Sequence, residues 1–239
     1  RPQEPGSTRQ WEPFALDFER VITAVEADAI TLDAPVCCAI ERRWGGGIVL
    51  PFDDSGRVEE CGVENLSGVS TFDRTVTAEY KGEKYLSDEA HAADFIHVDA
   101  ARNCWVRGVS ARYFAVSLVN VKRARQVTVE DCDNAEMVSQ ITGSRRYPYY
   151  ISQGQRVLVR RVKSESGRHD FAVGARVAGP NVFLECTAGR AFATSEPHHR
   201  WSVGGLYDNV KANLAIQDRQ YMGTGHGWRA RVVRGAESR

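Results

Sequence analysis

The chain has 239 residues, of which 42% are hydrophobic and 26% charged. This composition excludes a disordered chain and a collagen-like fibre, and no apolar run reaches the roughly 18 residues of a membrane-spanning helix. Lys plus Arg and Asp plus Glu both number 31, so a formal net charge of zero gives no bulk attraction to nucleic acid or to an anionic membrane. We therefore expect a single soluble domain over residues 1–239, with neither nucleic acid nor a membrane as its partner.

Two short apolar runs lie near the start of the chain, at residues 21–25 and 29–32. Their β-branched residues and the short polar link between them predict a small hairpin. We expect residues 1–50 to form an N-terminal cap or the first coil of the fold. Further along, residues 71–92 are polar enough to be an inserted surface loop.

A short pattern recurs along the chain: an apolar residue, two mostly polar ones and a second apolar residue. Its copies are Leu66–Val69, Val106–Val109, Val129–Cys132, Val159–Val162 and Tyr207–Val210, with a shortened copy at Leu184–Cys186. The steps from Val109 to Cys132 and from Cys132 to Val162 match one coil of a solenoid, in which each coil packs on the next, and the longer step from Val69 to Val109 fits a coil plus the inserted loop. The pattern predicts an all-β parallel β-helix with Val106, Val129, Val159 and Leu184 in its core.

Two other β folds fit this pattern less well. An antiparallel sandwich commonly uses Asn-Gly or Asp-Gly turns between its strands, and the sequence contains neither dipeptide. A propeller needs blades of about 40 residues or more throughout. The parallel β-helix is therefore the preferred architecture.

The six cysteines lack the spacing of a metal site. Three of them, Cys104, Cys132 and Cys186, lie within strand-like runs and not in loops. Cysteine in such a run usually behaves as a small apolar core residue. We therefore expect these three thiols to be free and buried.

Histidines recur late in the chain at intervals close to the coil length. The interval from His169 to His198 is nearly equal to the interval from His198 to His226. If these intervals are whole coils, the three imidazoles line one groove; the alternative is a polar ladder that only satisfies turn backbone groups. Because neighbouring strand residues face opposite sides, His198 and His199 share a face only in a turn, and so do His169 and Asp170. Other titratable or aromatic residues nearby are Arg168, Glu196, Arg200, Trp201, Asp218, Arg219 and Trp228.

A second candidate cluster is the segment 143–150, which contains Arg145, Arg146, Tyr147, Tyr149 and Tyr150. It lies in a loop one coil before His169. Guanidinium groups hold carboxylates in a bidentate manner, and tyrosines recognise sugars or act as acids. The alternative is a surface loop with ordinary tyrosine packing.

Several motifs resemble a known family. Gly167–Phe171 (Gly-Arg-His-Asp-Phe), His198–Trp201 (His-His-Arg-Trp) and Met222–Trp228 (Met-Gly-Thr-Gly-His-Gly-Trp) stand in strand-rich sequence with Val127–Cys132. In this combination they resemble right-handed parallel β-helix proteins of the pectate-lyase-like superfamily. The resemblance implies a right-handed solenoid in a secreted or periplasmic protein, but it does not fix a reaction, because lyases, hydrolases, epimerases and binding modules share this scaffold.

The preferred hypothesis is a lyase that cleaves an acidic polysaccharide by β-elimination at a uronic acid. Arginines would neutralise the uronate carboxylate, a histidine would remove the C5 proton, and a tyrosine would protonate the leaving oxygen. The candidates for these roles are Arg145, Arg146, Arg168 and Arg200; His169, His198 and His199; and Tyr147 and Tyr149. Further substrate contacts are expected from Trp201, Arg219, His226 and Trp228.

Two alternatives to a lyase stay open. A glycoside hydrolase would use Asp170 with Glu196 or Asp218 as its paired carboxylates, and a non-catalytic β-helix would only bind carbohydrate. No cofactor is expected; a Ca²⁺ site would need several converging carboxylate oxygens, for which only scattered candidates exist. The pattern leaves the oligomeric state open.

Overall fold

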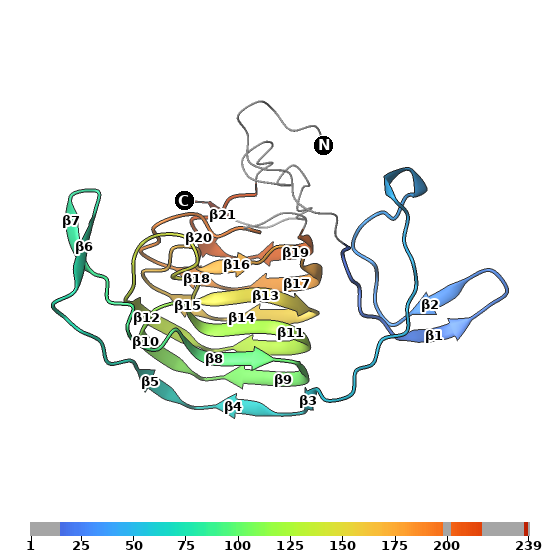
Figure 1. The fold of residues 1–239 in the computed structure, drawn as a ribbon, viewed down its shortest axis with the longest axis horizontal. Helices are drawn as coiled ribbons and strands as arrows, with labels where there is room; N and C mark the ends of the chain where they lie inside the picture. The colour runs from blue at the N-terminus through green and yellow to red at the C-terminus, as the bar shows by residue number, and fades with distance from the viewer. Residues whose placement is uncertain (1–14, 198–201, 217–236, 239) are drawn as a thin grey trace.

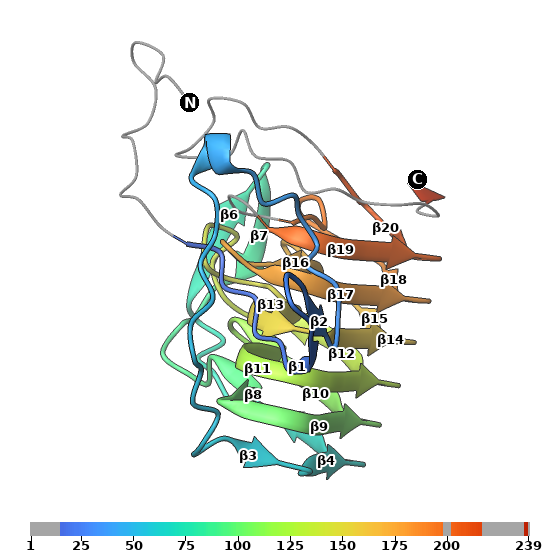
Figure 2. The same ribbon diagram turned by 90° about the vertical axis from the view of Figure 1, so that its right-hand side faces the viewer.

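The structure, a computed structural model, describes residues 15–197, 202–216 and 237–238. These residues form β-strands and one 3₁₀-helical turn, η1 (Arg42–Trp44), which confirms the all-β expectation. In the described part of the chain, no helix is long and apolar enough to cross a membrane. Two long parallel sheets make up the body of the molecule (Figures 1 and 2).

The first sheet has ten strands and the second has seven, and within both every pairing is parallel. The first contains β3 (Val58–Glu59), β4 (Gly62–Glu64), β8 (Asp94–Asp99), β9 (Ala101–Arg107), β11 (Ser117–Glu130), β13 (Tyr149–Gln155), β14 (Val157–Arg160), β16 (Phe171–Val173), β17 (Ala178–Leu184) and β19 (Val203–Asp208). The second contains β5 (Ser67–Val69), β10 (Ser110–Phe114), β12 (Asp133–Met137), β15 (Lys163–Ser164), β18 (Thr187–Ala188), β20 (Lys211–Ala212) and β21 (Glu237–Ser238).

The pairing register shows how successive passes of the chain stack. Val129 pairs with Val106 on one side and with Val159 on the other, and the ladder continues through Phe183 and Tyr207. Each of these side chains is at most 2% exposed, so one repeated position supplies a continuous apolar core. The long parallel sheets are compatible with the expected β-helix.

The structure corrects two copies of the sequence pattern. Leu184, expected in the core, is only partly buried, because strand neighbours face opposite sides and Phe183 occupies the inner position. The supposedly shortened copy is therefore the full-length Phe183–Cys186. Similarly, the strand partner of Val106 is Val63, so the first copy begins at Val63 and not at Leu66.

The second apolar position of the pattern forms its own buried row. Its members precede the paired strands of the second sheet and are at most 2% exposed: Val109, Cys132, Val162, Cys186 and Val210. Cys104, Cys132 and Cys186 are free and buried, as predicted. Burial raises the pKa of Cys132 to about 11 and that of Cys186 to about 12, which disfavours the reactive thiolate at both.

We call the stretch of chain from one ladder residue to the next a coil. Two segments lengthen individual coils. Between β5 and β8, in the segment 71–92 expected to be inserted, the antiparallel strands β6 (Thr77–Tyr80) and β7 (Glu83–Leu86) form a hairpin that projects beside the stack (Figure 1). Residues 138–148 connect β12 to β13, on the coil that runs from Val129 to Val159 and is longer than the two coils after it. The strands on either side of both segments still pair in parallel with their neighbours.

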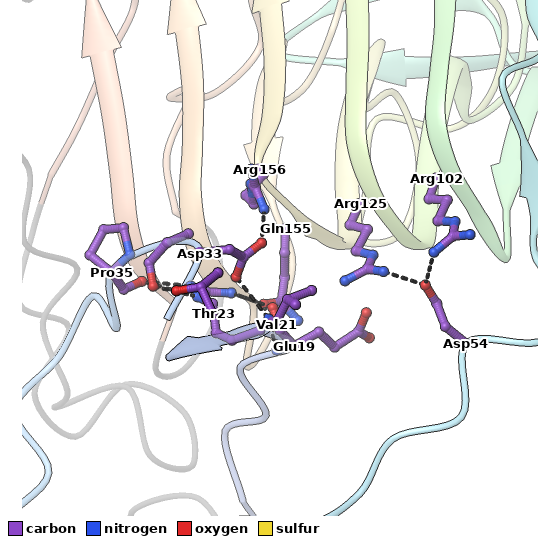
Figure 3. A network of polar contacts seen from close by, with 12 residues as sticks. Glu19, Val21, Thr23, Asp33, Pro35, Asp54, Arg102, Arg125, Gln155 and Arg156 are labelled. Atoms are coloured by element: carbon purple, nitrogen blue, oxygen red, sulfur yellow. Dashed lines mark hydrogen bonds and ion pairs between the residues drawn. The ribbon is translucent and has the colours of Figure 1, made fainter. Parts of the chain in front are cut away.

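The N-terminal hairpin is confirmed: β1 (Ile22–Val25) and β2 (Ile30–Leu32) pair antiparallel. The residues beside this hairpin contact the side of the stack. A cap would instead cover one end of the stack. Arg20 donates to the carbonyl of Gly179 at 2.8 Å and to Gln155 Oε1 at 3.0 Å. Arg156 pairs with Asp33 at 2.5 Å (Figure 3). These partners lie on and beside β13 and β17, whereas β3, β4 and β5 form the first level of the stack.

Candidate functional site

Three of the predicted site residues meet at the corner where the loop 138–148 approaches the turn before β16. Tyr147 lies in the loop, and Arg168 and His169 lie in the turn. The backbone N–H groups of Arg168 and His169 both donate to the carbonyl of Arg146, at 2.7 and 3.2 Å. These bonds join two successive coils, so the site is assembled from separate segments of the sequence. We call Tyr147, Arg168 and His169 the corner triad.

The imidazole of His169 is held by contacts to both of its ring nitrogens. Nδ1 lies 2.5 Å from the carbonyl oxygen of Thr194, and Nε2 lies 2.7 Å from Nη1 of Arg168. A carbonyl can only accept a hydrogen bond and a guanidinium can only donate one. This geometry assigns the neutral tautomer with its proton on Nδ1, which leaves the Nε2 lone pair facing Arg168. The side chain is 2% exposed.

Arg168 is the accessible member of the triad. Its side chain is half-buried, while Tyr147 is 4% exposed. Nη1 of Arg168 also donates to the hydroxyl of Tyr147 at 3.3 Å, and that hydroxyl accepts from the N–H of Ser144 at 3.1 Å. Among the described residues no carboxylate pairs with Arg168. A positive charge without an acidic partner therefore lies between an imidazole and a phenol.

Glu196 lies behind the imidazole, with 4.0 Å between its Oε1 and Nδ1 of His169. It is 1% exposed, and a buried carboxylate at this distance stabilises an imidazolium once His169 takes up a proton. The sequence suggested Glu196 only as a hydrolase carboxylate. Knowledge of the actual coil length would have placed Glu196 near His169. Val173 pairs with Pro197 on the next coil, and this pairing brings Glu196 beside the segment that contains His169.

Asp170, the neighbour of His169 in the turn, faces Ser164 and not the corner triad. Its Oδ1 accepts a hydrogen bond from Ser164 Oγ at 2.6 Å, and its buried Oδ2 has no hydrogen-bond partner among the described residues. Burial raises the pKa of Asp170 to about 6. A Cβ atom at Gly167 would collide with Oδ1, so the glycine of the Gly-Arg-His-Asp-Phe motif makes room for this carboxyl group. Asp170 thus belongs to the interior.

The two arginines of the loop 138–148 are already occupied. Arg146 is 3% exposed and donates to the carbonyls of Ser139 and Ser166, and burial lowers its pKa to about 10. Arg145 binds both carboxylate oxygens of Glu89 in the inserted segment, at 2.6 and 3.0 Å. These contacts fasten the loop and the insertion to the stack. The sequence predicted that both guanidinium groups bind a substrate carboxylate, whereas in the structure both bind groups of the protein itself.

Tyr149, one of the two candidate acids, is a core residue. It is 1% exposed, its ring stacks on Phe171 with centroids 5.9 Å apart, and its hydroxyl donates to the carbonyl of Lys163 at 2.8 Å. Burial also raises its pKa. Of the two tyrosines, Tyr147 is the one beside His169, with ring centroids 5.3 Å apart.

The interval from His169 to His198 is longer than a coil step. In this part of the stack the next coil brings Phe183 to Tyr207, and the contact of His169 on the next coil is Thr194. The interval to His198 thus exceeds the coil step seen here, and because His198 and His226 lie outside the described residues, the expected row of histidines stays a prediction. The other predicted site residues lie outside the described residues: His198, His199, Arg200, Trp201, Asp218, Arg219, His226 and Trp228.

The described residues contain no group of three or more His, Cys, Asp or Glu side chains arranged to hold a metal ion. The scattered acidic residues that left Ca²⁺ open in the sequence thus do not converge within the described ranges. What the corner triad can supply is a cation, a proton acceptor and a proton donor within one network of hydrogen bonds.

Comparison with known proteins adds no relative. No protein-family model matches the chain, and searches of the curated proteins and of the solved structures gave no match. The geometry of the corner triad is therefore the basis on which a function is proposed.

Proposed function

We propose that the chain is a right-handed parallel β-helix of the pectate-lyase-like type, secreted or periplasmic, that cleaves an acidic polysaccharide by β-elimination at a uronic acid. The parallel sheets with their continuous apolar ladder support the architecture, and the sequence motifs support the family. The substrate is an anionic sugar chain, which fits a protein with no net charge only if the attraction is local.

One observation carries the proposal: Arg168, half-buried and without a carboxylate partner among the described residues, donates to both His169 and Tyr147. β-Elimination needs a cation at the uronate carboxylate, because neutralising that charge makes the neighbouring C5 proton acidic. It also needs a base for that proton and an acid for the leaving oxygen. The corner triad provides one residue type for each task.

The proposed reaction moves two protons and breaks the C4–O bond of the sugar chain. Arg168 binds the carboxylate, and Nε2 of His169 accepts the C5 proton. The electron pair left at C5 forms a double bond to C4 as the C4–O bond breaks. Tyr147 gives its phenol proton to the departing oxygen. Glu196 stabilises the imidazolium that results.

The resting geometry adds a condition to this mechanism. Arg168 occupies Nε2 of His169 at 2.7 Å, so the base is blocked until the guanidinium moves. A uronate carboxylate offers Arg168 a stronger, charge-assisted pair than a neutral imidazole does. Substrate binding therefore frees the base that acts on it, and neutral sugars leave His169 blocked.

The hydrolase alternative loses support from the position of Asp170. This carboxyl group is bonded to Ser164 Oγ on the side of the chain away from the corner triad. Paired glycosidase carboxylates must both reach the scissile bond. A non-catalytic carbohydrate binder remains as an outcome of the test below.

The test is incubation of the purified chain with a panel of polyuronates and neutral polysaccharides, with and without a chelator. A lyase produces an unsaturated uronide, followed by its ultraviolet absorbance, from polyuronates alone. New reducing ends without that absorbance would indicate a hydrolase. Retention on a polyuronate without any cleavage would indicate a binder, and both outcomes would overturn the lyase proposal.

A further inference from the structure

A second cluster of ligand-type residues lies where the inserted segment leaves β5 and passes β10. It consists of Phe72 and Arg74 from the insertion and Arg112 and Tyr113 from β10, and we call it the Arg74–Arg112 patch. Both arginines are exposed and both aromatic residues are half-buried. The two rings meet edge to face, with centroids 5.1 Å apart. None of these residues belongs to the corner triad.

The two guanidinium groups stack on the same aromatic pair. Arg112 Cζ lies 5.3 Å from the ring centroid of Tyr113, while Arg74 Cζ lies 5.9 Å from that centroid and 5.3 Å from that of Phe72. Stacking fixes the plane of a guanidinium but leaves the N–H groups along its edge available. The patch therefore presents two oriented sets of hydrogen-bond donors beside one tyrosine.

Neither of these two charges is bound by a carboxylate within the described ranges. Neither side chain has an ion-pair or hydrogen-bond partner there, although Arg107, Arg123 and Arg161, also on the surface, each bind a carboxylate. Glu136 is the strand partner of Arg112 in the register, yet the two form no ion pair. Two like charges repel each other near a shared ring. An external anion would remove that repulsion.

The backbone of β10 is shaped to present Tyr113. The pairing of β10 with β12 shifts register on both sides of Arg112, and Tyr113 has a φ of 69°, in the left-handed region that side chains rarely adopt. Bulges of this kind redirect a side chain and are common beside binding sites. The strand thus departs from regular geometry at the residue on which both guanidinium groups stack.

We propose that the Arg74–Arg112 patch binds the carboxylate groups of an acidic glycan as a second site, independent of the reaction at the corner triad. Uronate carboxylates accept hydrogen bonds from guanidinium edges, and sugar faces pack on half-exposed rings. A nucleic acid needs an extended basic stripe, whereas this patch has two arginines on a chain without net charge.

The test measures the affinity of the full chain for a short oligogalacturonate by isothermal titration at low ionic strength. The variant R74Q/R112Q should bind about 10-fold more weakly, since two charge-assisted contacts are lost. The matched control R42Q/K211Q removes the same charge from two other exposed positions and should bind within about twofold of the parent chain. Melting temperatures of both variants should equal that of the parent.

The result separates this proposal from the lyase. Equal losses in both double variants would mean that only net charge matters, and unchanged binding in R74Q/R112Q would mean that the patch is not a site; either outcome overturns the inference. If the chain forms no unsaturated product but R74Q/R112Q still weakens binding, the lyase proposal falls and the patch stands. If R168Q abolishes cleavage while R74Q/R112Q leaves binding unchanged, the lyase proposal stands and the patch is not a site.

Discussion

Inside the stack, one position is filled on five successive coils by Val106, Val129, Val159, Phe183 and Tyr207, all buried. At the corner between two of these coils the residues differ: Tyr147 on one coil lies beside Arg168 and His169 on the next. The interior is constrained by neighbours of its own kind, while the corner is free to differ from coil to coil. Substitutions should therefore affect stability in the first region and chemistry in the second.

The largest expected effect is on stability, at the inner position that the sequence assigned to the wrong residue. Phe183→Ala should lower the free energy of unfolding by about 3–5 kcal/mol, because it opens a cavity in the ladder. Leu184→Ala, next in the chain but outward-facing, should cost less than about 1 kcal/mol. Urea unfolding of both variants measures the difference, and equal costs would contradict the register described for β17.

The next effect is on turnover. His169→Ala should lower turnover on a polyuronate by about 100-fold or more, the usual scale for loss of a general base. Arg145→Gln, whose guanidinium is bound to Glu89, should leave turnover within a few-fold of the parent. A His169 variant that keeps its activity but melts at a much lower temperature would instead make this histidine a structural ladder residue.

Asp170 should give the interior an unusual pH dependence. Its carboxyl group has a pKa of about 6 in the folded chain and an ordinary value of 3.8, so the folded state holds a proton that the unfolded state releases between these values. Stability from this group is present below the ordinary pKa and is lost as the pH rises through the folded one, by about 2–3 kcal/mol. Asp170→Asn should therefore gain roughly that much relative to the parent between pH 4 and pH 7 in urea unfolding. Parallel pH profiles for the two chains would show that Asp170 is not desolvated.

The smallest effect concerns thiol labelling, where the interior differs from the exposed surface. Cys132 and Cys186 are buried with raised pKa values, whereas Cys61 is exposed on the first level of the stack. Under native conditions an alkylating reagent should label Cys61 and leave Cys132 and Cys186 unmodified, as read by mass spectrometry. Rapid labelling of the buried pair would indicate that the stack opens locally.

The sequence was sufficient to predict most core residues of the repeated part of the molecule, but it was insufficient to predict the contacts at the corner. Apolar spacing identified Val106, Val129 and Val159 as core residues, because a buried ladder repeats apolar residues at similar intervals. Leu184 was misassigned because two adjacent apolar residues fit the pattern equally well, and only pairing decides which faces inward. The contacts of Arg168 could not be foreseen, since they depend on a turn and on a loop whose paths no periodicity specifies.

The long step from Val129 to Val159 has a consequence for how such a protein can change. The coil that contains residues 138–148 is longer than the two that follow it, yet Val129 still pairs with Val159 and Asp133 with Lys163. The extra length is absorbed at the corner, beside Tyr147. Evolution can therefore lengthen, shorten or exchange that corner while the fold stays the same, and an engineer could graft a foreign loop there to redirect which ligand is recognised.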